Sequence, residues 1–232
     1  MKSLVLYSTI VGGFYAQTEP FVQTMNNARA EVGGDTWKRG YSAKEPTGAT
    51  ATASEALYNA GIEPVQFEGE LTTVGFVENT DTAGNLYPKL RVGLKQGDHE
   101  LLLSVDLKSD VAQRLMTKLD NCKPGDRVKV SAWPTVVERA GRQFVNHGVS
   151  MKNAQGQEVP ANSAFSAEVK QLTEGVAATL LAAGISDKTV LNAAKSNKRI
   201  AAHKDLLLKM EDRFAVATAA PTDEAPATPQ AD

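Results

Sequence analysis

The clearest pattern in the chain is an alternation of apolar and polar residues between positions 65 and 153. Apolar side chains recur at every second position in five segments separated by turn residues, which is the pattern of half-buried strands. After the third segment the spacing becomes helical, with Val111, Leu115 and Leu119 on one face and Ser109 as the N-cap. The pattern therefore predicts strands at 67–78, 86–95, 99–107, 127–137 and 142–151, with a helix at 109–119 between the third and the fourth.

The flanking regions carry different patterns. Residues 1–64 form an N-terminal extension, for which we expect helices at 17–30 and 54–60 and a flexible Gly- and Thr-rich loop at 36–54. Residues 154–216 form a C-terminal helical region, with predicted helices at 163–183, after Ser186, and at 200–214. Residues 217–232 contain three acids and no base among Ala, Pro and Thr, which is typical of a disordered acidic tail.

The opening residues combine one lysine with a short apolar run, as a secretory signal does. Tyr7, Ser8 and Thr9 interrupt that run, and the residues around Ala16 are a poor cleavage context. We therefore expect a first strand or a short buried segment here. No stretch of the sequence reaches the roughly 18–20 apolar residues of a membrane span. The expected location is the cytoplasm, or the host cytoplasm if the chain is viral.

Three strands, one helix and two further strands are the order of the OB-fold, a small Greek-key barrel. Residues 123–130, with the sequence KPGDRVKV, have the turn and the alternating basic and apolar residues that commonly open the fourth strand of such barrels. Residues 65–153 thus resemble the OB-fold of single-stranded DNA-binding proteins of the phage and bacterial replication type. The resemblance implies a mainly β chain of the α+β class, with a five-stranded OB-type Greek-key barrel followed by C-terminal helices.

Replication proteins of this kind often end in an acidic disordered tail that recruits partners and competes with DNA. Residues 221–232 resemble such a tail in position and in the sign of their charge. They lack the terminal aromatic residue and the dense run of acids of the bacterial form.

Successive side chains of a strand point to opposite faces of a sheet, so the sequence also predicts which residues lie outside the barrel. In the second, fourth and fifth strands one parity is mainly apolar, and the other combines Lys or Arg with one large aromatic residue. Unpaired bases stack on aromatic rings at about 1–3 kcal/mol each, and cations bind phosphates without reading the sequence. The predicted surface for single-stranded nucleic acid therefore has Tyr87, Trp133 and Phe144 stacking bases, and Lys89, Arg91, Lys95, Arg127, Lys129 and Arg142 holding phosphates.

Each of these assignments has an alternative. Trp133 precedes Pro134 and could pack beneath the C-terminal helices, and Lys or Arg on an outer strand are common solvating residues.

A second cluster, in the N-terminal loop, either folds over a bound strand or is a surface loop that its two aromatic residues pin to the barrel. This cluster consists of Trp37, Lys38, Arg39 and Tyr41.

Composition and charge change this picture only in part. The chain has 232 residues, a formal net charge of −2 and 42% hydrophobic residues, which are ordinary values for a globular protein. Residues 108–152 nevertheless hold nine Lys and Arg against four acids, so positive charge is concentrated in the later strands. Glu68, Glu70 and Glu78 make the first strand acidic, which argues against a binding groove that crosses every strand.

Motifs for catalysis are absent from the sequence. It contains no nucleotide-binding, metalloprotease or hydrolase motif, its single cysteine is Cys122, and its three histidines lack metal-ligand spacing. We expect no enzyme, no cofactor and no metal. The expected function is largely sequence-independent binding of single-stranded DNA, which protects it in replication, recombination or repair.

The expected partners, besides DNA, are replication or recombination proteins that bind the C-terminal helices or the acidic tail. One barrel offers a small site, so we also expect a homo-oligomer or a cooperative assembly on DNA. Two other functions remain open: a structural or assembly protein whose barrel binds protein, and an RNA-binding OB module, because stacking serves either backbone.

Overall fold

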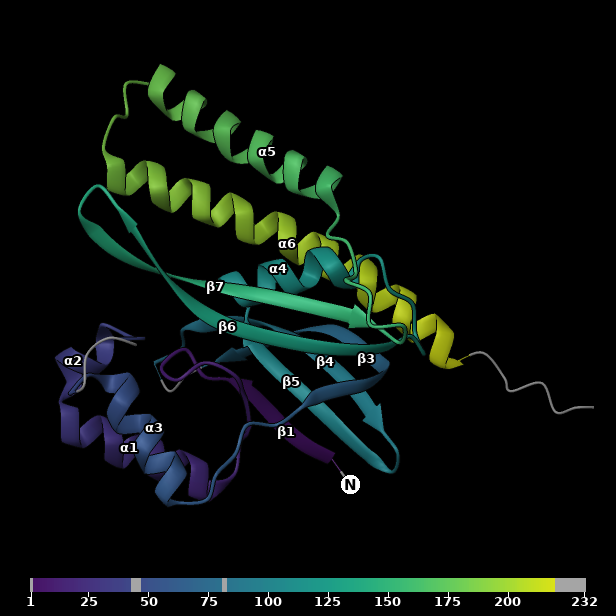
Figure 1. Ribbon diagram of the computed structural model, residues 1–232. Coiled ribbons are helices and arrows are strands. Elements are labelled where there is room, and N and C mark those ends of the chain that lie inside the picture. Colours follow the sequence, from purple (N-terminus) through teal and green to yellow (C-terminus); the bar gives the residue numbers. More distant parts are fainter. Residues whose placement is uncertain (1, 43–46, 81–82, 220–232) are drawn as a thin grey trace, which may run out of the picture.

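A computed structural model of the chain describes residues 2–42, 47–80 and 83–219. Within these ranges seven strands form one mixed sheet, in the order β2-β1-β5-β4-β3-β6-β7, and six helices lie around it (Figure 1). The strands are β1 Lys2–Tyr7, β2 Phe14–Ala16, β3 Phe67–Thr80, β4 Leu86–Gln96, β5 His99–Asp106, β6 Arg127–Arg139 and β7 Arg142–Asn153. The helices are α1 Glu19–Val32, α2 Gly34–Lys38, α3 Ala49–Asn59, α4 Asp110–Leu119, α5 Ser163–Ala182 and α6 Lys188–Ala219.

The centre of the sheet has the predicted order of three strands, one helix and two strands. The bounds of β3 to β7 differ from the predicted ones by at most two residues. The hydroxyl of Ser109 accepts a hydrogen bond from the Ala112 amide at 3.2 Å, which confirms Ser109 as the N-cap of α4. The predicted inward parity is confirmed in β4 and β6, although Leu86, assigned to the core, is exposed at the start of β4. Buried inward residues of these strands are Leu90, Val92, Leu94, Val128, Val130 and Ala132.

β3 connects two parts of the sheet, which we call its limbs: β2, β1, β5 and β4 on one side, and β6 and β7 on the other. It pairs with β4 from Glu70 to Thr80, but with β6 only from Phe67 to Glu70. A bulge lies between Leu71 and Thr73, at the point where β3 separates from β6. Because a bulge increases the local twist and bends a strand, the sheet curls here instead of continuing as a flat layer (Figure 1).

The sheet has seven strands, so the prediction of five was wrong. β1 pairs in parallel with β5, and β2 pairs antiparallel with β1. The interpretation of the opening residues as a strand is confirmed, but alternation within a strand does not identify the strand with which it pairs. The N-terminal extension is also more regular than expected, because α2 and the start of α3 fall within the predicted loop at 36–54. Residues 43–46 of that loop lie outside the described residues.

The two ends of the curled sheet meet through side chains. The Tyr7 hydroxyl of β1 and Nδ1 of His147 on β7 share a hydrogen bond of 2.8 Å, and their rings pack edge to face. Gly12, in the β1–β2 turn, lies so close to Pro134 of β6 that an added Cβ would be 2.6 Å from the proline Cδ. The β1–β2 hairpin therefore lies between β5 and β7, and a continuous core fills the curl beneath α4.

The C-terminal region differs from the prediction in one respect. The helices predicted after Ser186 and at 200–214 are a single helix, α6, which runs antiparallel to α5 (Figure 1). No Gly or Pro separates the two predicted segments, and Ile200 and His203 continue the packed face between them. Residues 217–219, predicted to be disordered, belong to α6, and residues 220–232 of the predicted tail lie outside the described residues.

The second half of α6 lies along β3, beyond the point where β3 leaves β6. Lys204 Nζ is 4.4 Å from the centroid of the Phe76 ring, and a Glu211 carboxylate oxygen accepts a hydrogen bond from the Phe76 amide at 3.3 Å. Arg213 donates to the carbonyls of Leu119 and Asp120 at the end of α4. These contacts fix the second half of α6 to β3 and to the end of α4. Among the described helices, none combines the length and the apolar character needed to cross a bilayer.

Candidate nucleic-acid interface

One face of the β6–β7 ribbon points away from the core. In the register of the two strands Trp133 lies opposite Gly148, and Val137 lies opposite Phe144. Directly opposed residues of an antiparallel pair share one face, so both rings belong to the same surface. We call this surface the outer face. From β6 it contains Arg127, Lys129, Ser131, Trp133, Thr135 and Val137, and from β7 it contains Lys152, Ser150, Gly148, Asn146 and Phe144.

A glycine positions Trp133 on this face. A Cβ atom added to Gly148 would lie 2.7 Å from Cε2 and 2.9 Å from Cζ2 of the indole, so the ring occupies the space above the bare backbone. The residue remains 46% exposed. Trp133 is thus not buried under the C-terminal helices: one side of its ring rests on the ribbon, and the rest is accessible to a ligand.

Phe144 provides a second ring further along the same face. It is 48% exposed and lies opposite Val137, four residues beyond Trp133 on β6. At the rise of a strand this separation is about 13 Å. The opposed pair of Thr135 and Asn146 lies between the two rings, so hydrogen-bonding groups and aromatic groups alternate along the ribbon.

The cations of the outer face lie toward β3. Arg127 and Lys129 are exposed, and each forms a salt bridge with Glu68 of β3, at 3.3 and 3.7 Å. Lys152 lies directly opposite Lys129 and adds a third cation. Exposed salt bridges of this kind contribute little to stability and are screened by salt. Glu68 therefore reduces the local positive charge without holding the Arg127 and Lys129 side chains in one position. Arg142 pairs with Arg139 at the ribbon tip through its backbone, and its side chain lies outside the described part of the chain.

The register does not bring Tyr87 together with the other two rings. Tyr87 is 39% exposed on β4, where it lies opposite Asn79 of β3. The pairing of β3 with β6 ends at Glu70, so Tyr87 belongs to the other limb of the sheet. Lys89 and Arg91 share the face of Tyr87 and are half-buried, and the Arg91 Nε atom is buried without a hydrogen-bond partner.

Lys95 connects the two limbs. It lines a hollow of about 270 Å³ together with Glu70 of β3 and Arg127 of β6. Gly69 makes this close approach possible, because a Cβ there would lie 2.5 Å from the Lys95 carbonyl oxygen. Of the cations predicted on β4, Lys95 is therefore the one placed beside the cations of β6.

The N-terminal cluster lies elsewhere. Trp37 is half-buried against the small core that contains Ile10 and Ala28, and Lys38 forms an exposed salt bridge with Asp35 at 3.7 Å. Arg39 is exposed, and Tyr41 is half-buried. Burial, and to a smaller degree the proximity of Tyr41, raises the pKa of Tyr7 above its ordinary value. Trp37 thus packs against the small N-terminal core, and only Tyr41 of this cluster lies near Tyr7 of β1.

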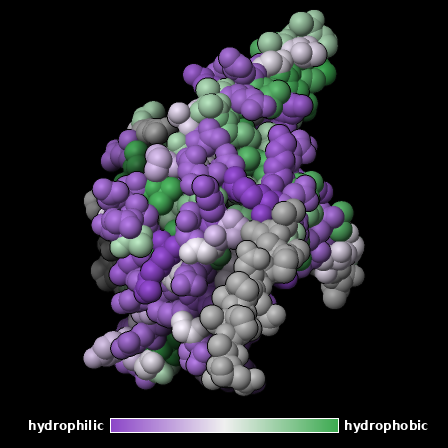
Figure 2. Space-filling model, turned by 90° about the vertical axis from the view of Figure 1, so that its right-hand side faces the viewer, coloured by the Kyte–Doolittle hydropathy of each residue, from purple (hydrophilic) through white to green (hydrophobic). Residues whose placement is uncertain are grey.

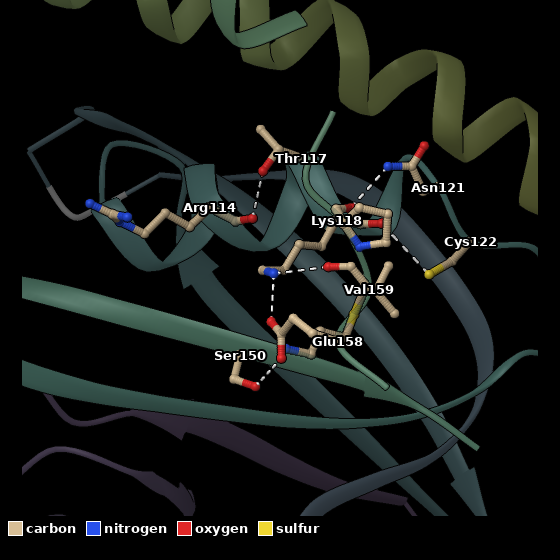
Figure 3. A network of polar contacts seen from close by, with 10 residues as sticks. Arg114, Thr117, Lys118, Asn121, Cys122, Ser150, Glu158 and Val159 are labelled. Atoms are coloured by element: carbon tan, nitrogen blue, oxygen red, sulfur yellow. Dashed lines mark hydrogen bonds and ion pairs between the residues drawn. The ribbon is translucent and has the colours of Figure 1, made fainter. Parts of the chain in front are cut away.

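A polar network closes the free edge of β7 (Figure 3). Glu158 accepts hydrogen bonds from Lys118 Nζ and from the Ser150 hydroxyl, both at 2.6 Å, and from the Met151 amide. Burial opposes ionisation of this carboxyl, but the three hydrogen bonds outweigh it and lower the pKa of Glu158 below its ordinary value. The ionised Glu158 ties α4 to β7 and so supports the ribbon from its edge.

Two other kinds of site come into question in the described residues, a reactive thiol and a metal-binding cluster. Cys122 is buried and donates to the Lys118 carbonyl, and its burial raises the thiol pKa to about 11, so it is not a thiolate at neutral pH. In the described part of the chain, no cluster of three or more His, Cys, Asp or Glu residues is arranged to hold a metal ion.

Three residues of the interface escaped the sequence prediction: Gly148, Lys152 and Glu68. Their roles depend on the residue that each one faces across a strand pair, and a register is not visible in the alternation of a single strand. Pairing the predicted fourth and fifth strands through the Ala140–Gly141 turn would have placed Gly148 opposite Trp133. Comparisons with protein-family models, with curated proteins and with solved structures find no match to this chain.

Proposed function

We propose that this protein binds single-stranded DNA without strong sequence preference, through the outer face of the β6–β7 ribbon. The observation that carries the proposal is the exposed Trp133 ring held over Gly148, in line with Phe144 and with the cations Lys129 and Lys152. The cellular role would be to protect unpaired DNA during replication, recombination or repair.

The chemistry of this face suits an unpaired strand. Bases of a single strand expose their ring faces, and each stacking contact contributes about 1–3 kcal/mol. A duplex hides those faces, so the rings favour single strands. Lys129, Lys152 and Arg127 would bind phosphates and release counterions, with a dependence of log affinity on log salt of roughly −0.7 for each phosphate contact. None of these contacts requires a particular base.

In this proposal the curled sheet is an OB-type barrel with two added strands. The supporting features are the order of β3 to β7, the bend in β3, and α4 inserted between β5 and β6. The added β1–β2 hairpin lies on the inner side of the ribbon, where Tyr7 meets His147. The outer face is therefore left free for a ligand.

The test is a set of titrations with labelled oligo-dT, a duplex and an RNA of equal length, at several salt concentrations. The proposal predicts tight binding of oligo-dT that weakens steeply with salt, weak binding of the duplex, and a loss of affinity in Trp133→Ala. Tyr58→Ala is the matched control, because Tyr58 is 84% exposed on α3, away from the sheet. A preference for RNA would assign the RNA-binding alternative. No salt-sensitive binding of any nucleic acid would contradict the proposal and favour a structural or assembly role.

A further inference from the structure

The α5–α6 hairpin projects away from the sheet (Figure 1). The α6 residues that reach β3 and α4, namely Lys204, Glu211 and Arg213, lie in its second half. Residues 175–194, at the free end of the hairpin, include only two charged residues, Asp187 and Lys188. Figure 2 shows apolar residues gathered at the upper end of the molecule, where this part of the hairpin lies. The free end of the hairpin, which lies away from these contacts with β3 and α4, thus presents an apolar surface.

One flank of the hairpin contains a groove of about 140 Å³ between the two helices. Its floor is apolar, and its two rims differ in charge. The α5 rim has Glu168, whereas the α6 rim has Lys198 and Lys209 with Asp205 between them. The remaining lining residues are Phe165, Leu172, Ala201, Ala202 and Leu206.

The apolar floor continues toward the free end of the hairpin. Residues eleven apart on a helix differ by only about 20° in direction, so Val176 lies on the same side of α5 as Phe165. By the same spacing Val190 lies on the same side of α6 as Ala201, and it is 45% exposed. A strip of apolar side chains therefore extends from the groove to the end of the hairpin.

We propose that a second copy of this chain covers this flank, so that two α5–α6 hairpins form a two-fold symmetric four-helix contact. The charges favour this occupant. The first seventeen residues of α6 contain five Lys and Arg and no acid, whereas α5 contains Glu168 and Glu174 against Lys170. A two-fold axis that runs along the groove, parallel to the two helices, lays α5 of each copy over α6 of the other. Each Glu168 then faces the partner's Lys198, and the two basic helices do not face each other.

The decisive experiment mixes two charge-reversed variants, Glu168→Lys and Lys198→Glu, and measures mass by sedimentation. Each variant alone places like charges in contact twice in a symmetric dimer, and we expect the dimer dissociation constant to rise about tenfold or more. In a mixed dimer each Lys meets a Glu of the other chain, so the mixture should regain the affinity of the unmodified chain. Pairing within one chain cannot explain that recovery, because in each variant the side chains at positions 168 and 198 carry charges of the same sign and repel each other.

Two further variants check the surface. Val190→Glu should weaken the dimer, because it puts a charge into the apolar strip. Leu181→Glu is the control: Leu181 is exposed but lies about 180° around α5 from Leu172, so the dimer should be unaffected. Circular dichroism verifies that each variant is folded. A monomeric unmodified chain at every concentration, or a mixture that stays as weak as its components, would overturn the proposal. DNA is absent from these measurements, so their outcome is independent of the proposed function.

Discussion

The outer face of β6–β7 and the N-terminal cluster have similar residues in different surroundings. Both combine tryptophan, a second aromatic residue and cations. Trp133 rests on Gly148 and keeps 46% of its surface exposed, whereas Trp37 packs into the small core with Ile10 and Ala28. Phe144 is exposed on the ribbon, whereas Tyr41 is half-buried beside Tyr7.

The difference comes from what lies under each ring. On the ribbon the opposite residue is a glycine, so one side of the indole covers backbone and 46% of the residue stays exposed. In the N-terminal region apolar side chains of α1, α3 and the β1–β2 turn pack with Trp37, and the same residue type becomes part of a core. Aromatic residues among cations therefore indicate a ligand surface only when one side of the ring is left open.

The largest expected effect comes from truncating the two tryptophans. Trp133→Ala should weaken binding of oligo-dT by roughly 5- to 150-fold, the equivalent of one lost stacking contact. Trp37→Ala should leave that affinity within about twofold, but should reduce the free energy of unfolding by about 2 kcal/mol, because it opens a partly buried cavity. Oligonucleotide titration and urea unfolding measure the two quantities. The comparison fails if the two variants behave alike in both measurements.

A methyl group at Gly148 should give the next largest effect. Gly148→Ala places a Cβ where the indole now lies, so Trp133 must move, and we expect the affinity to fall roughly fivefold. Because the glycine acts only through the indole, Gly148→Ala should have no further effect in a Trp133→Ala background. Gly175→Ala is the matched control, since no atom lies within 4 Å of the added methyl group. Additive losses in the double variant would show that Gly148 does not act by positioning Trp133.

Neutralising Glu68 should produce a smaller change of opposite sign. Glu68→Gln frees Arg127 and Lys129 from their salt bridges, so oligo-dT affinity should rise about two- to fivefold, and its dependence on salt should steepen. Glu100→Gln removes a similar exposed bridge, to Lys2, away from the outer face and serves as the control. Equal effects of the two variants would mean that overall charge, rather than this cluster, controls binding.

The smallest expected effect is a pH dependence of stability at the contact between Tyr7 of β1 and His147 of β7. Burial lowers the pKa of His147 and of His203 below the ordinary value of about 6.5. Below about pH 6.5 the unfolded chain therefore binds more protons than the folded chain, and the free energy of unfolding should fall with decreasing pH. His147→Gln should retain a hydrogen bond to Tyr7 and flatten this dependence, as measured by thermal unfolding at about pH 7.5 and about pH 5. An unchanged pH dependence in this variant would contradict the assignment to His147.

Much of the fold was predictable because alternation and helical spacing are local. The five central strands, Ser109 as a cap and the exposed parity of Trp133 follow from residues close together in the chain. The pairing of β1 with β5, the bend of β3 and the separation of Tyr87 from Trp133 depend on register and on a bulge, which join residues far apart in sequence. Local alternation therefore predicted the exposure of Trp133 and Phe144, but the grouping of the outer face required the pairing of the strands.

The central claim is that a base stacks on Trp133. The direct measurement is the emission of Trp133 in a Trp37→Phe chain, where it is the only tryptophan, during titration with oligo-dT. We predict strong quenching that saturates with the bound fraction measured on labelled DNA and is reversed by added salt. DNA binding that leaves the Trp133 emission unchanged would contradict the account.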